Sequence, residues 1–247
     1  MPLLSIPRSN LPFKFDDDTQ TRILRYVEFW KFESMIESKS LYFSRADLLG
    51  DPFECSIPQS HFGKKYTQEE FKEMRNKHTY NTIIEQVNEL SKEIYVSCWT
   101  INSRENDLMW KAYVQGNEGV SIQSTVGRFD GSLGDPCIYD FPYMGMSKVK
   151  YIDDMRERLD GKNILEYVMY KRKEFEDDRE LRAVIWNDIP DKPKGICVPV
   201  DLSILIETIY IAPTANFEFH EKVESVVKKY LPNVVVKSSA LSKKPLR

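Results

Sequence analysis

Short strand-like segments follow one another closely along the chain, and this feature constrains its fold most. The runs "RILRYV", "LYFSR", "IYVSCWT", "EGVSIQST" and "ETIYIAP" are rich in β-branched and aromatic residues, the composition typical of strands. Amphipathic stretches of helical period stand between some of them. Because many strands are neighbours in sequence, the pattern predicts an α+β fold. We expect a mixed, mostly antiparallel sheet with flanking helices rather than a doubly wound parallel sheet.

Two segments show the clearest helical pattern. The first covers residues 67–93, where Thr67 and Glu70 have the spacing of a capping box. The second covers residues 216–231, "NFEFHEKVESVVKKYL", and is strongly amphipathic. The remaining expected segments are a long loop or hairpin over 127–147, a helix over 154–175 and a strand over 178–186.

The chain of 247 residues is long enough for a sizeable core. Its sequence contains neither an internal repeat nor a linker that would divide it, so we expect an N-terminal arm over 1–20 and a single catalytic-type domain over 21–247. The formal net charge of -3 provides no overall basic field of the kind that attracts nucleic acid without sequence preference.

Cysteines and apolar runs indicate the cellular compartment. The four cysteines are far apart and there are only three histidines, so the sequence offers no clustered zinc ligands and no metal is expected. The N-terminal apolar run is too short for a signal peptide, and no run is long enough to cross a membrane. These observations predict a cytoplasmic protein with reduced thiols and no membrane partner.

The segment "YKRKEFEDDRELRAVIW", residues 170–186, combines charges with an apolar run. If its second half is a strand, Asp178, Glu180 and Arg182 all point to one face, because side chains alternate along a strand. The apolar run that follows draws this strand toward the interior. Glu180 is therefore either part of a buried ion pair or a carboxylate that stabilises a developing positive charge or accepts a proton.

Two N-terminal segments carry polar residues with two interpretations each. Arg25 lies in an otherwise apolar strand, where it either forms a structural ion pair or holds a phosphate or carboxylate with its planar guanidinium. In "LYFSRADLLGDPFE", Asp51 and Glu54 either build a rigid turn or, with Ser44, line the floor of a pocket.

The middle of the chain is rich in aromatic residues. Ser97 and Cys98 could form a nucleophile, but no histidine is close in sequence, and a buried strand position is the alternative for Cys98. Trp99, Trp110 and Tyr113 either stack on a planar ligand or pack in the core, and we favour the core for Trp110.

Four motifs resemble, in this order, those of a prokaryotic family of domains of unknown function. They are "LYFSRADLLGDPFE", "VSCWT", "LMWKAYVQGNEGVSI" and "EDDRELRAV", and the resemblance covers roughly residues 22 to 240. Members of that family are often found near mobile or defence loci. The resemblance supplies no reaction.

More distantly, the chain resembles the ADP-ribosyltransferases. An arginine-aromatic strand, a middle strand with an aromatic-x-Ser pattern and a late acidic-x-Glu strand occur in the same order, and the ending "ELRAVIW…VPVDLSILIETIYIAP" is similar to that of DNA-modifying members. The resemblance implies that Arg25 holds NAD, that Glu180 orients the ribose and that Asp178 occupies the first acidic position. It also implies that Ser97 shapes the nicotinamide pocket, although Ser44 in "YFSR" competes for this role.

The resemblance further implies a reaction and partners. NAD would be a substrate, without metal, and Tyr26, Tyr42 or Trp99 would hold its nicotinamide ring. Cleavage of the nicotinamide–ribose bond builds positive charge on the ribose, which a nearby carboxylate stabilises. The product would be a mono-ADP-ribosylated macromolecule, either protein or nucleic acid. A toxin or phage-defence effector of bacterial origin, with an antitoxin or immunity partner, fits this reading.

Two alternatives come from other functional classes. One is a non-enzymatic module of the same fold that binds a nucleotide or a protein. The other is a metal-dependent nuclease, whose divalent cation would be held by carboxylates spread over two motifs. The sequence lacks a recognisable nuclease spacing, so the second ranks lower. The carboxylates in question are Asp51, Glu54, Asp178 and Glu180.

Overall fold

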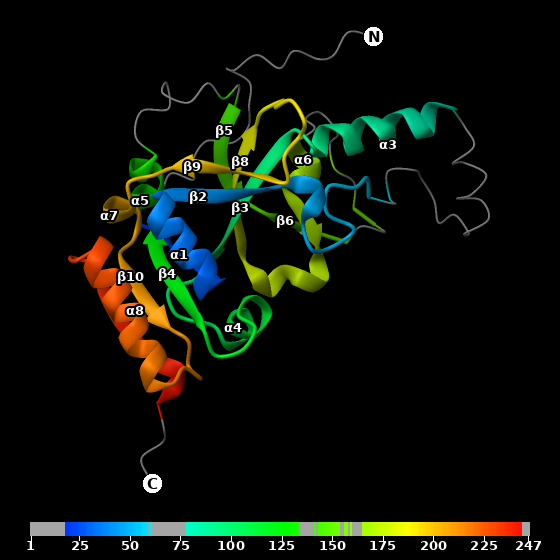
Figure 1. The fold of residues 1–247 in the computed structure, drawn as a ribbon. Helices are drawn as coiled ribbons and strands as arrows, with labels where there is room; N and C mark the ends of the chain where they lie inside the picture. Colours follow the sequence, from blue (N-terminus) through cyan, green and yellow to red (C-terminus); the bar gives the residue numbers. More distant parts are fainter. Residues whose placement is uncertain are drawn as a thin grey trace. The chain divides into compact units, whose positions relative to one another are not determined.

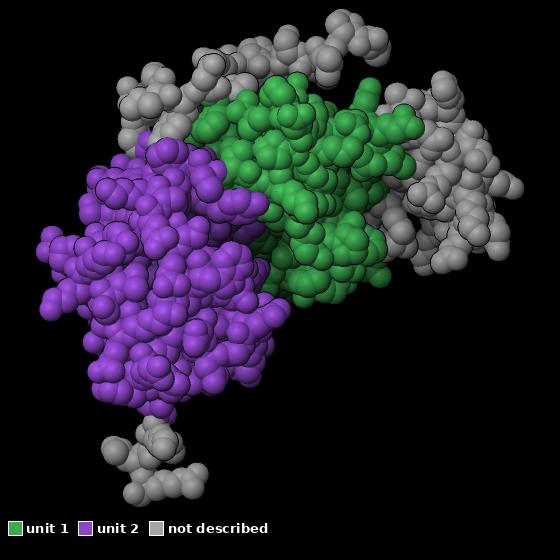
Figure 2. Space-filling view, viewed as in Figure 1, with its two compact units in different colours: residues 1–14, 43–97, 141–196 green, residues 15–42, 98–140, 197–247 purple. Residues whose placement is uncertain are grey.

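The computed structural model divides the chain into two compact units (Figure 2). It describes residues 18–58, 60, 78–133, 141, 143–153, 156–157, 159 and 165–243. Unit 1 comprises Met1–Lys14, Phe43–Ser97 and Phe141–Ile196, and unit 2 comprises Phe15–Tyr42, Cys98–Asp140 and Cys197–Arg247. Most of the expected arm lies outside the described residues, so its boundary at residue 20 stays a prediction.

The sheet of unit 2 is mainly antiparallel (Figure 1). Strand β1 (Arg22–Glu28) pairs along its whole length with β4 (Gly119–Thr125), and its start pairs with the end of β3 (Ile94–Ile101). Strand β10 (Thr208–Ile211) runs antiparallel to the other side of β4. Strand β11 (Val235–Ser238) runs parallel to β10, which requires a crossover between them.

That crossover is α8 (Phe217–Tyr230), and its sequence explains both its start and its packing. The side chain of Asn216 accepts a hydrogen bond from the backbone N–H of Phe219 and so caps the helix. Phe219 meets Phe29 of α1 (Phe29–Ser38) edge to face, with ring centroids 5.0 Å apart. The remaining helices of this unit are α4 (Asp107–Tyr113), α5 (Val126–Ser132), α7 (Leu202–Leu205) and the 3-10 turn Ala240–Ser242.

Unit 1 is built around β8 (Glu180–Trp186), which pairs with β3 and with β5 (Tyr143–Lys148). On its other side, β3 pairs antiparallel with β2 (Ser40–Arg45), with Ser44 opposite Val96. A second, small sheet joins β6 and β7 in parallel. The other segments with residues in this unit are α3 (His78–Ser91), α6 (Leu165–Val168), β6 (Lys150–Ile152), β7 (Tyr170–Arg172), β9 (Gly195–Pro199) and the 3-10 segments Ala46–Leu48 and Lys173–Asp178.

The predicted fold class is confirmed, because the protein is a mixed α+β structure with a mostly antiparallel sheet. The helix expected over 154–175 is wrong. Within the described part of that range, only Leu165–Val168 is α-helical, and Tyr170–Arg172 forms a strand because it pairs with β6. The loop or hairpin expected over 127–147 instead contains most of α5 and most of β5. The expected capping box at residue 67 lies outside the described residues.

Candidate active site

The residues selected from the sequence fall in both units, and each unit is described by itself. Glu180 is the first residue of β8 and is only 5% exposed. Arg182 holds its carboxylate side-on, with Nε 2.7 Å from Oε1 and Nη2 3.1 Å from Oε2. Two residues apart on one strand, the pair shares a face as the alternation predicts. A bidentate contact of this kind fixes the plane of the carboxylate.

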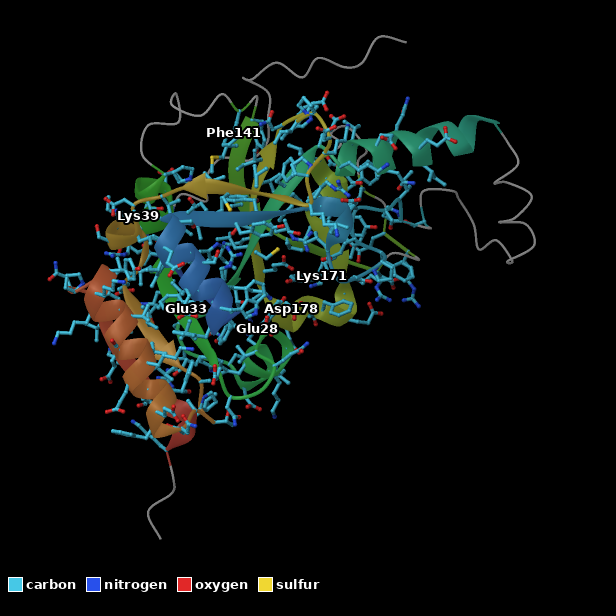
Figure 3. The ribbon with its side chains drawn as sticks, in the orientation of Figure 1. Glu28, Glu33, Lys39, Phe141, Lys171 and Asp178 are labelled. Atoms are coloured by element: carbon cyan, nitrogen blue, oxygen red, sulfur yellow. The ribbon has the colours of Figure 1, made fainter. Side chains whose placement is uncertain are left out.

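Asp178 does not belong to this strand, which corrects the expected strand start at residue 178. It ends the 3-10 segment Lys173–Asp178, and Arg179 follows in a left-handed conformation with φ 44° that turns the chain into β8. Asp178 nevertheless reaches the same cluster of charges, because its Oδ2 accepts a hydrogen bond of 2.7 Å from Lys171. Figure 3 labels both residues.

Lys171 of β7 lies among three carboxylates. Its Nζ is 2.7 Å from Asp178 Oδ2, 3.3 Å from Glu180 Oε2 and 3.7 Å from Glu54 Oε1. Burial lowers the pKa of Lys171, but Glu180, Asp178 and Glu54 together outweigh it and raise the pKa above its ordinary value. Lys171 is therefore a permanently charged ammonium at neutral pH.

Glu54 completes the group from the turn after β2. Arg182 Nη2 donates to Glu54 Oε1 as well as to Glu180, while Arg182 Nη1 donates to the carbonyl oxygen of Val168 at 2.5 Å. Three carboxylates thus face two cations. We call this set the charge cluster: Glu54, Lys171, Asp178, Glu180 and Arg182.

The backbone of Glu180 is fixed as firmly as its side chain. Its N–H donates a 2.7 Å hydrogen bond to the hydroxyl of Tyr151, and its carbonyl accepts 2.9 Å from the N–H of Val149. Burial raises the pKa of Tyr151 to about 12, so the hydroxyl is neutral at physiological pH. Hydrogen bonds therefore fix both the backbone and the carboxylate of Glu180 in position.

A separate ion pair lies in the same unit. Arg172 donates to both oxygens of Asp51 at 3.1 Å, and its guanidinium is 4.2 Å from the ring centroid of Phe53 and 5.3 Å from that of Phe175. The Asp51 side chain also accepts the N–H of Phe53 at 3.1 Å, which builds the turn. The turn interpretation of this motif therefore holds, and Glu54 additionally joins the charge cluster.

In unit 2, Arg25 is half-buried on β1. Its Nη2 donates to the carbonyl oxygen of Tyr42 at 3.3 Å, and its guanidinium lies 5.8 Å from the ring centroid of Trp99. Burial lowers its pKa, against the opposing influence of Cys98 and Tyr113. Arg25 thus lies over an aromatic ring, an arrangement suited to a planar cation.

The three aromatic candidates for the nicotinamide ring differ in how far their side chains are exposed. The Tyr26 ring is buried, meets Trp110 edge to face at 5.0 Å, and its hydroxyl accepts from the N–H of Asn106. Trp99 is 2% exposed, and within the described part of the chain its Nε1 has no hydrogen-bond partner. Tyr42 is 47% exposed. Of the three, Tyr42 offers the most free surface, and the core interpretation of Trp110 is confirmed.

The two candidate serines lie on neighbouring strands of unit 1. Ser97 is fully buried on β3, whereas Ser44 on β2 is half-buried, with its hydroxyl 3.5 Å from the carbonyl oxygen of Arg45. The geometry leaves the choice between them open. Among the residues that the structure describes, no group of His, Cys, Asp and Glu is arranged to hold a metal ion. No helix in the described part of the chain has the length and apolarity to span a membrane.

From the sequence, Glu54 is grouped with Asp178 and Glu180 only as a possible cation ligand, and Lys171 and Arg172 are not identified as partners of these carboxylates. Both cations fall in the range 154–175 that is expected to be helical, although they lie on a strand. In "YKR" two adjacent cations follow the apolar residues Val168 and Met169, so the segment lacks the period-two alternation that indicates a strand. The contact from Glu54 to Arg182 spans 128 residues, and no local pattern predicts it.

Comparison with known proteins finds no matching family model and no matching curated protein. Solved structures of Thermus sp. 2.9 DarT are similar to the chain. The complex with carba-NAD+ has a TM-score of 0.39 at 10% identity, covering 90% of this chain and 96% of that one. The complex with NAD+ has a TM-score of 0.38 at 11% identity, covering 88% and 96%. The complex with ADP-ribosylated ssDNA has a TM-score of 0.39 at 10% identity, covering 90% and 95%. A likeness of this size says nothing about activity.

Proposed function

We propose that this protein is a mono-ADP-ribosyltransferase that uses NAD as substrate and modifies a macromolecule. The observation that carries the proposal is the Glu180 carboxylate, which Arg182 and Lys171 hold in one orientation at the start of β8. Two cations contact this carboxylate, and a carboxylate in a fixed position is what a developing positive charge requires. The order of the arginine, serine and glutamate motifs along the sequence supports the same reading.

The main requirement of the reaction is a carboxylate held close to the ribose. When the bond between nicotinamide and the ribose breaks, nicotinamide leaves with the bonding electrons and the ribose becomes positively charged. A carboxylate with a fixed position stabilises this charge without the cost of reorienting. An acceptor nucleophile then bonds to the ribose and gives up its proton. We assign the stabilisation of this charge to Glu180. Asp178 supports it, because both carboxylates pair with Lys171.

Arg25 is assigned to the pyrophosphate of NAD, since a guanidinium matches phosphate oxygens with two parallel hydrogen bonds. Tyr42 is the aromatic candidate that we favour for the nicotinamide ring, because its ring is the most exposed of the three. Ser44 or Ser97 shapes the nicotinamide pocket. Tyr26 and Trp99 are buried in the core of unit 2, so we favour neither of them for the contact with the nicotinamide ring.

The acceptor is either protein or nucleic acid, and a toxin or phage-defence role in the bacterial cytoplasm, with an antitoxin or immunity partner, follows the sequence resemblance. The net charge of -3 does not attract nucleic acid over long range. Single-stranded DNA is a rational first probe because one DarT structure holds ADP-ribosylated ssDNA. A cell extract supplies protein acceptors in a parallel reaction.

The test is release of nicotinamide from NAD by purified protein, with and without these acceptors, beside the E180Q variant. Glu93→Gln is the matched control, because Glu93 is also an ion-paired carboxylate of unit 1, bonded to Lys192 at 2.8 Å. Release by wild type and by E93Q, with loss in E180Q, supports the proposal. Equal release by all three proteins contradicts it.

A second candidate is a non-enzymatic module that binds a nucleotide or a protein. The burial of Glu180 favours it, because a carboxylate that is 5% exposed and paired with two cations also fits a purely structural role. Such a module binds NAD or a fragment without releasing nicotinamide, and E180Q then alters stability only. The nuclease reading lacks support, since each of its four carboxylates contacts a lysine or arginine of the protein itself.

A further inference from the structure

We infer that Glu54 is a positioning residue for Glu180, acting through Arg182. This inference rests on the proposed function, because it assigns Glu54 a part in the same NAD-cleaving site. Arg182 Nη2 donates to Glu180 on one side and to Glu54 on the other, so the guanidinium is held between two carboxylates. Glu54 also lies 3.7 Å from Lys171, the second cation that touches Glu180.

The geometry makes Glu54 the outer anchor of this arrangement. Arg182 approaches Glu180 with Nε and Nη2 and directs Nη1 to the carbonyl oxygen of Val168. Without the carboxylate of Glu54, Arg182 and Lys171 both lose an anionic neighbour in a buried place. Removal of one partner leaves a buried charge less well compensated, which is costly. We expect Arg182 and Lys171 to shift in response and so to change the orientation of the Glu180 carboxylate.

The turn that carries Glu54 is held by contacts that lie outside the charge cluster. The N–H of Glu54 donates to the carbonyl of Asp51 at 2.9 Å, and Cys55 follows with φ 57° and a thiol 3.3 Å from the carbonyl oxygen of Ala46. The hydroxyl of Tyr170 lies 2.9 Å from the carbonyl oxygens of both Phe53 and Ser56, which ties the turn to β7. The position of the Glu54 carboxylate is therefore set by backbone contacts that a side-chain substitution leaves in place.

Asp51 provides a matched control within the same turn. Both side chains are 4% exposed, and both carboxylates pair with an arginine of unit 1. Asp51 pairs with Arg172, whose guanidinium also lies near the rings of Phe53 and Phe175, and neither ring belongs to the charge cluster. E54A and D51A each remove one carboxylate that pairs with an arginine. Only E54A removes a carboxylate that pairs with Arg182.

The kinetic experiment measures kcat and KM for nicotinamide release by wild type, E54A, E54Q and D51A. We expect kcat of E54A to fall about 100-fold with KM nearly unchanged, because a misplacement of about 1 Å at the reacting centre has this effect. E54Q recovers part of the loss, since its amide oxygen still accepts from Arg182. D51A keeps the kcat of wild type.

Thermal unfolding of each variant separates positioning from stability. If Glu54 is only structural, E54A lowers the melting temperature as D51A does, and kcat per folded molecule stays at the wild-type value in both, which overturns the inference. A drop in kcat for D51A as large as that for E54A overturns it as well.

Crystal structures of wild type, E54A and D51A test the position of the Glu180 carboxylate independently of whether the protein has enzymatic activity. We expect the Glu180 carboxylate to leave its bidentate contact with Arg182 in E54A and to keep it in D51A. An unchanged contact in E54A overturns the inference. If wild type releases no nicotinamide but E54A shows the displacement, the proposed function fails while the role of Glu54 in holding Glu180 stands.

Discussion

Glu180 and Arg182 face each other two residues apart on β8, with Arg182 Nε 2.7 Å from Glu180 Oε1 and neither side chain more than 6% exposed. A pair in this position is costly to create, because both charges lose their water, and costly to break, because the remaining charge stays buried. The fold offsets the first cost by adding Lys171, Glu54 and Asp178 around the pair. The second cost makes the cluster open to testing by substitution.

Replacing Arg182 with methionine is expected to destabilise the protein by about 3–5 kcal/mol, because the buried carboxylates of Glu180 and Glu54 both lose the guanidinium that pairs with them. Urea unfolding at pH 7 measures this loss. The double variant R182M/E180L removes both charges of the pair and is expected to recover most of the stability. A loss below about 1 kcal/mol for R182M, as exposed ion pairs give, would contradict this description of the cluster.

The ion pairs of Lys171 should make the stability of the folded protein fall at alkaline pH. Its pKa is raised in the folded protein, so its contribution is fully present below the ordinary lysine pKa of about 10.4 and is lost as the pH rises through the higher folded value. The difference in unfolding free energy between wild type and K171M should be constant from about pH 7 to 9 and shrink above about pH 10.5. Urea unfolding across this range checks it.

Lys111→Met serves as the control for Lys171, because the ion pair of Lys111 with Asp107 is exposed at the surface of α4. Its effect should stay below about 1 kcal/mol at every pH. A K171M difference that persists unchanged above about pH 11 would show that the carboxylates do not stabilise the ammonium form.

Arg25 is expected to contribute mainly to substrate binding. Because a pyrophosphate carries its charge in the ground state and in the transition state alike, R25K should raise KM for NAD about tenfold or more while kcat changes far less. Arg22→Lys is the control, since Arg22 is exposed on the same strand. Steady-state nicotinamide release measures both constants. A selective loss of kcat in R25K would instead place Arg25 at the reacting centre.

The sequence predicted most strands and the two-residue relation between Glu180 and Arg182, because both follow from local alternation. The segment "EFWKFESMIESK" has the 3.6-residue period of an amphipathic helix, and its apolar stripe in α1 is buried, with Phe29, Phe32, Met35 and Ile36. The strand predicted to start at Asp178 begins two residues later, at Glu180, since the left-handed conformation of Arg179 has no reliable sequence signature outside glycine.

The rest of the cluster depends on contacts between distant segments. Lys171 lies on a strand because β6 pairs with it, although the run 171–178, "KRKEFEDD", has seven charged residues in eight and otherwise favours an exposed helix. Glu54 reaches Arg182 across 128 residues of sequence. Such relations are set by the packing of the chain, and single-sequence patterns contain no information on them without an alignment.

The central claim is that the Glu180 carboxylate cleaves NAD by stabilising charge on the ribose, and nicotinamide release by E180Q tests it most directly. The account predicts release by wild type, with a cell extract present as source of acceptors, and a rate at least about 100-fold lower for folded E180Q. E93Q should match wild type. Folded E180Q that releases nicotinamide at the wild-type rate, or wild type that releases none with the extract present, would contradict the claim.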